Sequence, residues 1–434
     1  MSALKRGLRS SFSSLAVRNY RLFFFGQAVS IGGTFMQMTA QSWLVLNLTG
    51  SAAALGVVTA FQFTPTLLLS PYAGVIADRV DKRRLLVATQ VAAMALAFIL
   101  GLLAITGAVQ LWMVMALAAA LGLVGAFDSP ARQVLVTEMV GSDMLTNALT
   151  LNNITMNVGR LLGPAVAGLV IARWDLAICF LANGASYVVS IGSLVLMRVK
   201  DLLPAPRAEK AKGQLREGLR YVWSRPTLLM PLLLMLLVGT VTYEFLVTLP
   251  VLARDTFGVD AAGYGVMQSA MSIGAIAGGL VIAAKAHATF RTLGMASIAF
   301  GVVMLALAMS PTFGIALGVL LFVGAASTLF TTLINAMLLH GTSHEMRSRV
   351  MALYSVAFVG STPIGGPIVG WIAQEWGVRW ALAVGGVAAL AGAGLVAVAI
   401  RSQRRRAAAE GDGRDDVVEV IEVEPGLVPA GEAA

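Results

Sequence analysis

Long apolar stretches separated by short polar segments dominate this chain. A helix that crosses a membrane needs about 20 mostly apolar residues. In lipid, such a stretch must satisfy its backbone hydrogen bonds internally, so helices are expected. The pattern predicts an all-α integral membrane protein of twelve transmembrane helices, at 22–48, 54–77, 85–106, 111–127, 146–172, 176–197, 228–250, 263–284, 292–310, 313–338, 350–373 and 380–400.

Polar residues inside three of these spans recur at steps of three and four, which places them on one face of a helix. Amides that face lipid would be costly, so these faces are predicted to point inward. Hydrogen bonds between helices would explain any single stripe, whereas several together favour a water-filled cavity. The predicted cavity lining is Gln27, Thr34, Gln37 and Gln41 in span one, Asn153 and Asn157 in span five, and Thr331 and Asn335 in span ten.

Composition leads to the same class. Hydrophobic residues make up 58% of the 434 residues and charged residues only 12%, against about 25% charged in soluble domains. A soluble fold could not hide so much apolar surface. A single cysteine, Cys179, and three scattered histidines predict no disulfide, no metal site and no cofactor. The first span is too long for a signal peptide and is read as a retained helix.

The positions of Lys and Arg predict the topology. With the N-terminus in the cytoplasm, the basic residues gather on that side, at 5–21, 79–84, 132, 198–225, 285–291, 347–349 and 401–414. The outer loops hold only Arg173, Arg254 and Arg379. This is a positive-inside pattern with both termini cytoplasmic, in the cell membrane. It also explains the net charge of +9 without a nucleic-acid partner.

A long basic loop separates the spans into six plus six. We expect an N-terminal bundle at 1–197, a cytoplasmic linker at 198–226, a C-terminal bundle at 227–400 and a disordered tail at 401–434. The two halves also look like weak repeats. Gly163, Pro164 and Gly168 in span five match Gly366, Pro367 and Gly370 in span eleven. On its own this match could arise by chance, but together with the six-plus-six layout it suggests duplication.

The sharpest motif follows span two and reads Gly74-Val-Ile-Ala-Asp78-Arg79-Val-Asp81-Lys82-Arg83-Arg84. It resembles the signature of the major facilitator superfamily, Gly-x-x-x-Asp-Arg-x-Gly-Arg-Arg, except that Asp81 replaces a glycine. Gly74 would let a neighbouring helix approach closely. Asp78 could accept bonds from the first amides of an adjacent helix, and the resemblance implies that this helix is span eleven. The motif is therefore predicted to be a gate that forms and breaks, and the alternative is an ordinary basic loop.

Other stretches resemble one branch of that superfamily, the bacterial efflux proteins that include enterobactin and macrolide exporters. They are Arg18-Asn19-Tyr20-Arg21, Asp128-Ser-Pro130-Ala-Arg132-Gln133 and Arg160-Leu-Leu-Gly163-Pro164-Ala. Span five, with Gly159, Gly163, Pro164 and Gly168, also resembles the antiporter motif of drug exporters, and plain helix packing is the alternative. Leu169 stands where that motif has a second Gly. Arg132 is expected in a loop after span four, where Asp128 either pairs with Arg83 or Arg84 or has no partner.

Two charges lie inside predicted spans, Arg160 in span five and Glu244 in span seven. Each would cost roughly 2.5–3.5 kcal/mol at a helix centre. Arg cannot deprotonate, whereas Glu can. We hypothesise that Glu244 is the proton-linked site, coupled to Arg160. The alternatives are a static ion pair, or a Glu that contacts a cationic substrate.

The resulting expectation is a secondary active transporter that exports a small amphipathic drug or siderophore by proton-coupled alternating access. Its expected partners are the small-molecule substrate, protons and the lipid bilayer, and we expect a bacterial monomer. An importer of a sugar or other metabolite with the same fold is the first alternative. A membrane-embedded enzyme, a scramblase and a channel are further ones. No phosphate-binding loop, nucleophile elbow or His-Glu-x-x-His pattern occurs, so no enzymatic activity is expected.

Overall fold

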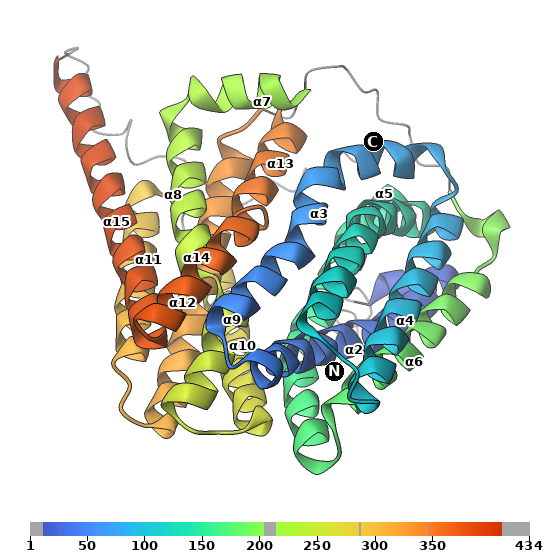
Figure 1. Cartoon of the computed structure of the whole chain (residues 1–434). Coiled ribbons are helices and arrows are strands. Elements are labelled where there is room, and N and C mark those ends of the chain that lie inside the picture. The colour runs from blue at the N-terminus through green and yellow to red at the C-terminus, as the bar shows by residue number, and fades with distance from the viewer. Residues whose placement is uncertain (1–11, 204–213, 286–287, 344, 410–434) are drawn as a thin grey trace, which may run out of the picture.

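The computed structural model describes residues 12–203, 214–285, 288–343 and 345–409, and these ranges contain helices and no strands. Figure 1 shows the helices gathered into two groups that lie side by side, α2–α6 and α8–α15. Nine stretches of the described residues are long and apolar enough to cross a membrane. One of them, Leu111–Arg173, holds two predicted spans. The helices α2 (Arg18–Thr49) and α10 (Ala261–Lys285) cover two more predicted spans. The described helices are therefore consistent with the predicted twelve spans.

The N-terminal half contains five long helices. Polar side chains start three of them, because Ser51, Asp81 and Asp175 each accept a bond from a first-turn amide. The helices are α2 (Arg18–Thr49), α3 (Ala52–Arg79), α4 (Lys82–Ile105), α5 (Leu111–Arg173) and α6 (Leu176–Val195), with short 3-10 turns at η1 (Ser13–Ala16) and η2 (Val199–Asp201).

Helix α5 continues beyond the predicted end of span four. It runs to a break at Gly141, whose φ of 70° is readily adopted only by glycine, and span five begins there. Ala131, Leu135 and Met139 bury one side of this extension in an apolar cluster with Phe23. That packing keeps the segment helical although its Ser-Pro pair resembles a turn. The expectation of a loop at Arg132 was therefore wrong.

The C-terminal half is interrupted twice within predicted spans. Span seven breaks between α8 and α9, at Tyr243 and Glu244, and span eleven breaks between α13 and α14. The elements are α8 (Pro226–Thr242), α9 (Phe245–Val251), a π-helical turn η3 (Leu252–Thr256), α10 (Ala261–Lys285), α11 (Phe290–Ala308), α12 (Phe313–His340), α13 (Arg347–Phe358), α14 (Thr362–Glu375) and α15 (Val378–Ala409).

Two predicted connecting segments contain helix. Helix α7 (Gln214–Trp223) lies in the predicted linker, beside α8 and α13. Helix α15 extends to Ala409, into the segment predicted as a disordered tail, and the remainder of that tail lies outside the described residues. We call the end of the molecule where α3 ends and α4 begins the basic end, since Arg79, Lys82, Arg83 and Arg84 lie there. The end where α2 ends and α3 begins is the opposite end.

Candidate functional site

Glu244 occupies the break between α8 and α9. It is only 2% exposed, and its Oε1 atom has no hydrogen-bond partner among the described residues. The side chain of Thr362, at the start of α14, interacts with the carboxyl group. A buried polar atom without a partner is costly and uncommon in folded proteins. Glu244 is therefore an exceptional group in an otherwise apolar span.

The carboxyl group of Glu244 lies against two glycines of α14. A β-carbon added to Gly365 would come within 2.8 Å of Glu244 Oε1, and one added to Gly366 would lie 3.6 Å from Oε2. Gly366 also touches α3, because a β-carbon on Gly56 would lie 2.2 Å from the Gly366 carbonyl oxygen. Glu244 thus packs against the Gly365-Gly366 pair, and this pair packs against α3 of the other half.

The same contact occurs twice, once on each side of the molecule. Added β-carbons on Gly56 and Gly370 would collide with the α14 and α3 backbones, at 2.2 and 2.6 Å. In the other contact, an added β-carbon on Gly265 would lie 2.3 Å from the Pro164 carbonyl oxygen. One on Gly168 would lie 2.8 Å from the Ala262 Cα. Span two meets span eleven in one case, and span eight meets span five in the other. Of the predicted packing residues, Pro164, Gly168, Gly366, Pro367 and Gly370 lie in these two contacts. Gly163 packs on α2 instead, since an added β-carbon would lie 2.6 Å from Phe35 Cβ.

Further bonds between the halves lie toward the opposite end. The Arg254 guanidinium donates to the Leu46 carbonyl, and the Ala52 amide donates to Gln374 Oε1 at 2.9 Å. Trp43 stacks on Tyr264 with ring centroids 6.2 Å apart. Nearer the centre of the molecule, hydroxyls of α10 reach the α5 carbonyls of Leu161 and Arg160, at 2.9 and 3.1 Å. We call this set of contacts, together with the two glycine contacts, the closed contact.

Polar contacts at the basic end stay within one half in the described residues. Lys82 lies 3.5 Å from Glu138, both in the N-terminal half, and Arg349 lies 2.7 Å from Glu217, next to the C-terminal half. Arg83 donates to the carbonyls of Leu194 and Val195 at 2.6 and 2.8 Å. The halves are therefore held together away from the basic end.

The polar contacts that the structure gives for the predicted gate residues stay within the N-terminal half. A β-carbon on Gly74 would meet nothing within 4 Å, so the expected close helix approach is absent there. Arg79 is exposed, and Arg84 uses its backbone amide to bond Asp81 at 2.8 Å. The side chain of Asp78 lies outside the described part of the chain. Its contact with span eleven stays a prediction.

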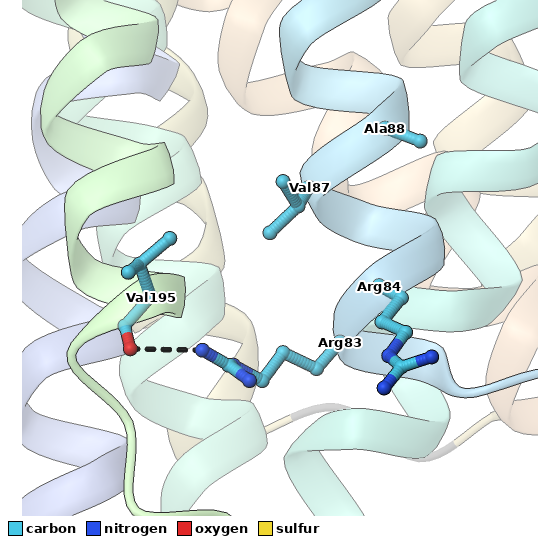
Figure 2. Close-up of a pocket in the computed structure, with 5 residues that line it drawn as sticks. All are labelled: Arg83, Arg84, Val87, Ala88 and Val195. Carbon is cyan, nitrogen blue, oxygen red and sulfur yellow. Dashed lines mark hydrogen bonds between the residues drawn. The ribbon is translucent and has the colours of Figure 1, made fainter.

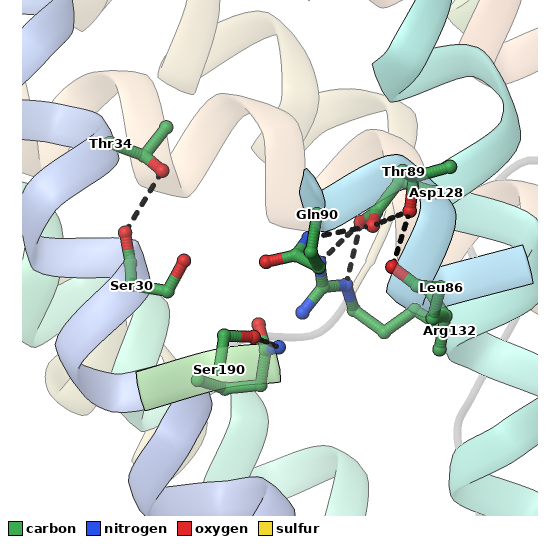
Figure 3. A network of polar contacts seen from close by, with 9 residues as sticks. Ser30, Thr34, Leu86, Thr89, Gln90, Asp128, Arg132 and Ser190 are labelled. Carbon is green, nitrogen blue, oxygen red and sulfur yellow. Dashed lines mark hydrogen bonds and ion pairs between the residues drawn. The ribbon is translucent and has the colours of Figure 1, made fainter. Parts of the chain in front are cut away.

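Asp128 belongs to a polar network inside the N-terminal half (Figure 3). It accepts bonds from Thr89 Oγ1 at 2.9 Å, from Gln90 Nε2 at 2.8 Å and from Arg132 Nε at 3.0 Å. Arg132 lies one helical turn further along α5, so the two charges pair at i and i+4. Both alternatives expected for Asp128, a pair with Arg83 or Arg84 and the lack of any partner, were wrong, because α5 stays helical and presents Arg132 instead.

The glutamines of α2 take part in packing. Gln27, Gln37 and Gln41 are 3–7% exposed. They bond Ser190 and Asn183 on α6 and Gln62 on α3, at 3.1, 2.7 and 2.9 Å. Thr34 bonds the Ser30 carbonyl within its own helix. The structure thus gives this stripe hydrogen bonds between helices rather than the predicted place on a cavity wall.

Other predicted cavity residues are more accessible. Asn153 and Asn157 are exposed on α5, on the basic-end side of the closed contact, and Thr331 and Asn335 on α12 are half-buried. Gly159 packs on α2, since an added β-carbon would lie 2.5 Å from Ile31. The Arg160 guanidinium lies 5.6 Å from the Phe35 ring centroid. Arg160 and Glu244 therefore have different neighbours among the described residues, and their coupling stays a prediction.

Sequence reasoning missed the position of Glu244 at a helix break and its contact with Gly365. The Gly365-Gly366-Pro367 run in span eleven is a signal for a close approach, but it does not identify the partner. That partner comes from another span and is fixed only by packing.

The helical fold, the matching family profile and the relatives described below define a transporter of the major facilitator superfamily, rather than an enzyme. Within that class, the chain belongs to the family of transmembrane secretion effectors, whose profile matches residues 9–420. It is a multi-pass membrane protein.

Relatives and solved structures agree with this assignment. The multidrug efflux pump Tap of Mycolicibacterium fortuitum is 28% identical over 378 residues, covering 82% of this chain and 90% of that protein. The staphyloferrin A transporter of Staphylococcus aureus is 26% identical over 263 residues, covering 60% of this chain and 66% of that protein, just under two-thirds of its length. A bacterial homolog of the human lysosomal transporter Spinster, in an inward-facing and occupied conformation, aligns with a TM-score of 0.71 at 14% identity, over 89% and 97% of the two chains. At that identity the likeness shows the fold alone.

Proposed function

We propose that this protein exports a small amphipathic molecule in exchange for protons. The positive-inside pattern puts the basic end in the cytoplasm. With that orientation, the closed contact lies toward the outside and the structure is the inward-facing state of an alternating-access cycle. The matches to an efflux pump over most of its length and to a siderophore transporter support export of a drug or a siderophore.

The observation that carries the proton-linked part is the unpartnered Oε1 atom of Glu244 beside the closed contact. An ionised carboxylate there would be a buried charge without a counter-charge, which is strongly destabilising. The closed contact therefore fits the protonated carboxyl group. Loss of the proton favours separation of α14 from α3, which exposes the carboxylate to water.

This preference gives a direction to the cycle. Glu244 takes up a proton when the outer side is open, and the protonated form lets the closed contact assemble. Release of the proton to the cytoplasm then favours the outward-open state. The change to that state carries the substrate outward. Protons move in as substrate moves out, so the exchange is an antiport.

The substrate class follows from the residues on the basic-end side of the closed contact. Asn153 and Asn157 offer amides, and Phe35 and Arg160 offer an aromatic face and one cation. Such a surface suits a neutral or weakly charged molecule with apolar and polar parts better than a polyanion. We therefore expect a medium-sized amphipathic substrate.

Accumulation of a fluorescent efflux dye in cells tests the proposal. Cells with the wild type should accumulate less dye than cells without it, and either a protonophore or Glu244→Gln should abolish the difference. Glu375→Gln is the matched control, because Glu375 is an exposed glutamate at the outer end of α14. Export that survives both Glu244→Gln and the protonophore would overturn proton coupling, and greater accumulation in the wild type would indicate import instead.

A further inference from the structure

A pocket of about 290 Å³ opens on the surface of the N-terminal half, between α4 and α6 at the basic end. Arg83, Arg84, Val87 and Ala88 line it from α4, and Val195 lines it from α6 (Figure 2). Two guanidinium groups therefore share one small cavity with three apolar side chains. The transport cycle proposed above uses none of these five residues.

The two arginines have different surroundings. Arg83 is held across the pocket by its bonds to the carbonyls of Leu194 and Val195, the last residues of α6. The exposed Arg84 guanidinium has no partner among the described residues. Arg18 adds a third cation nearby, since it donates to the Leu196 carbonyl at 3.2 Å. The acidic residue Asp81 caps α4, because its side chain accepts a bond from the Arg84 backbone amide. The pocket is therefore positively charged, with one guanidinium left for a ligand.

The surface that continues from the pocket shows which medium it faces. Val91 and Leu102 on α4 are 42% and 61% exposed, and Val188 on α6 is 56% exposed. Exposed apolar strips on two adjacent spans of a membrane protein face hydrocarbon rather than water. The arginines lie at the basic end of these strips, which is the level of the lipid headgroups.

We propose that this pocket binds one anionic phospholipid of the cytoplasmic leaflet. Its phosphate group lies on Arg84 and Arg83, and an acyl chain follows Val87, Ala88 and Val195 toward the exposed strips. Basic pockets between transmembrane helices on the cytoplasmic side are suited to such headgroups. A free phosphate ion would satisfy the arginines but would leave the apolar wall exposed. The bound lipid therefore needs both parts of the pocket.

The site gives the basic motif a second role. Arg83 and Arg84 belong to the segment that the sequence predicts to be a gate, yet in this structure Arg83 bonds the end of α6 and Arg84 is exposed (Figure 2). A lipid on these arginines would tie the start of α4 to the end of α6. It would thereby stabilise the fold of the N-terminal half.

Native mass spectrometry and thermal unfolding of the purified full chain in detergent test the site. Phosphatidylglycerol should bind as one retained molecule and raise the unfolding midpoint, whereas phosphatidylcholine and inorganic phosphate should do neither. Arg84→Gln should weaken phosphatidylglycerol binding by about fivefold, because one cation near an anionic membrane surface contributes roughly 1 kcal/mol. Ala88→Trp, which fills the pocket from an exposed position, should also remove the retained lipid.

Arg173→Gln is the matched control, because Arg173 is exposed at the opposite end. It should leave phosphatidylglycerol binding unchanged. Equal retention of phosphatidylglycerol by the wild type, Arg84→Gln and Ala88→Trp would overturn the proposal, as would equal binding of phosphatidylcholine. Stabilisation by inorganic phosphate alone would indicate a simple anion site and would also overturn it.

Discussion

Glu244 and Gly365 lie in direct contact, although they come from different spans. A β-carbon on Gly365 would lie 2.8 Å from Glu244 Oε1, so the absence of a side chain at position 365 makes room for the carboxyl group. The next residue, Gly366, touches α3 of the other half. The Glu244 side chain is thus placed where its ionisation can act on the contact between the halves.

Substitution of the glycine should disable the transporter. In Gly365→Ala, the new methyl group would lie 1.9 Å from the Thr240 carbonyl oxygen, so α14 must move away from α8. Overpacking of this kind costs about 1–3 kcal/mol. We expect a lower unfolding midpoint and a loss of most dye export. Gly192→Ala is the control, because a β-carbon there meets nothing within 4 Å. Wild-type export by Gly365→Ala would contradict the close packing at this position.

Protonation of Glu244 should control the closed contact. Spin labels at the exposed residues Asn47 and Trp376, near the opposite end of the two halves, report its opening. Raising the pH ionises Glu244, which should favour the open form and lengthen the distance between the labels. In Glu244→Gln the side chain cannot ionise, so the short distance should persist at every pH. A pH-dependent distance that is unchanged in Glu244→Gln would assign the titration to another group.

The two glycine contacts should be equivalent in energy. Gly56→Ala and Gly265→Ala each place a methyl group against a backbone carbonyl of the opposing half, at 2.2 and 2.3 Å. Each should shift the distance between the labels at Asn47 and Trp376 toward the open form, by about tenfold in the equilibrium for ~1.4 kcal/mol. Gly318→Ala, in open space on α12, should not. An effect confined to one of the two contacts would show that only that contact holds the halves together.

The Asp128 network should stabilise the N-terminal half. Arg132→Met leaves the Asp128 carboxylate with two neutral donors, and removal of one partner of a buried pair costs about 3–5 kcal/mol. Both groups here are partly exposed, so a loss of roughly 1–3 kcal/mol is expected. The double variant Asp128→Leu with Arg132→Met should recover part of the unfolding midpoint, and Arg79→Met serves as the exposed control. Additive losses in the double variant would show that the two charges do not interact energetically.

Several features of the molecule could be predicted from the sequence because they are local. The spans follow from apolar runs, the predicted orientation follows from the distribution of Lys and Arg, and the resemblance to the superfamily rests on contiguous motifs such as 74–84. Gly163-Pro164 and Gly366-Pro367 indicated close packing, because small residues are needed wherever two helix backbones approach. The length of α5 was missed, since Asp128-Ser-Pro130 resembles a turn and only the packing of Leu135 and Met139 keeps it helical.

Other features depend on which helices meet, and the tertiary structure alone decides them. The sequence places Glu244 in an apolar span, but its neighbours Thr362, Gly365 and Gly366 are more than a hundred positions away. Gln37 lies on a polar stripe in the sequence, but only the fold shows that Asn183 bonds it, and only the fold shows that Arg83 finds its acceptors on α6. A periodic pattern fixes the face on which a side chain lies, because helix geometry is local. The partner of that face is fixed by the packing of all helices together, which no single segment encodes.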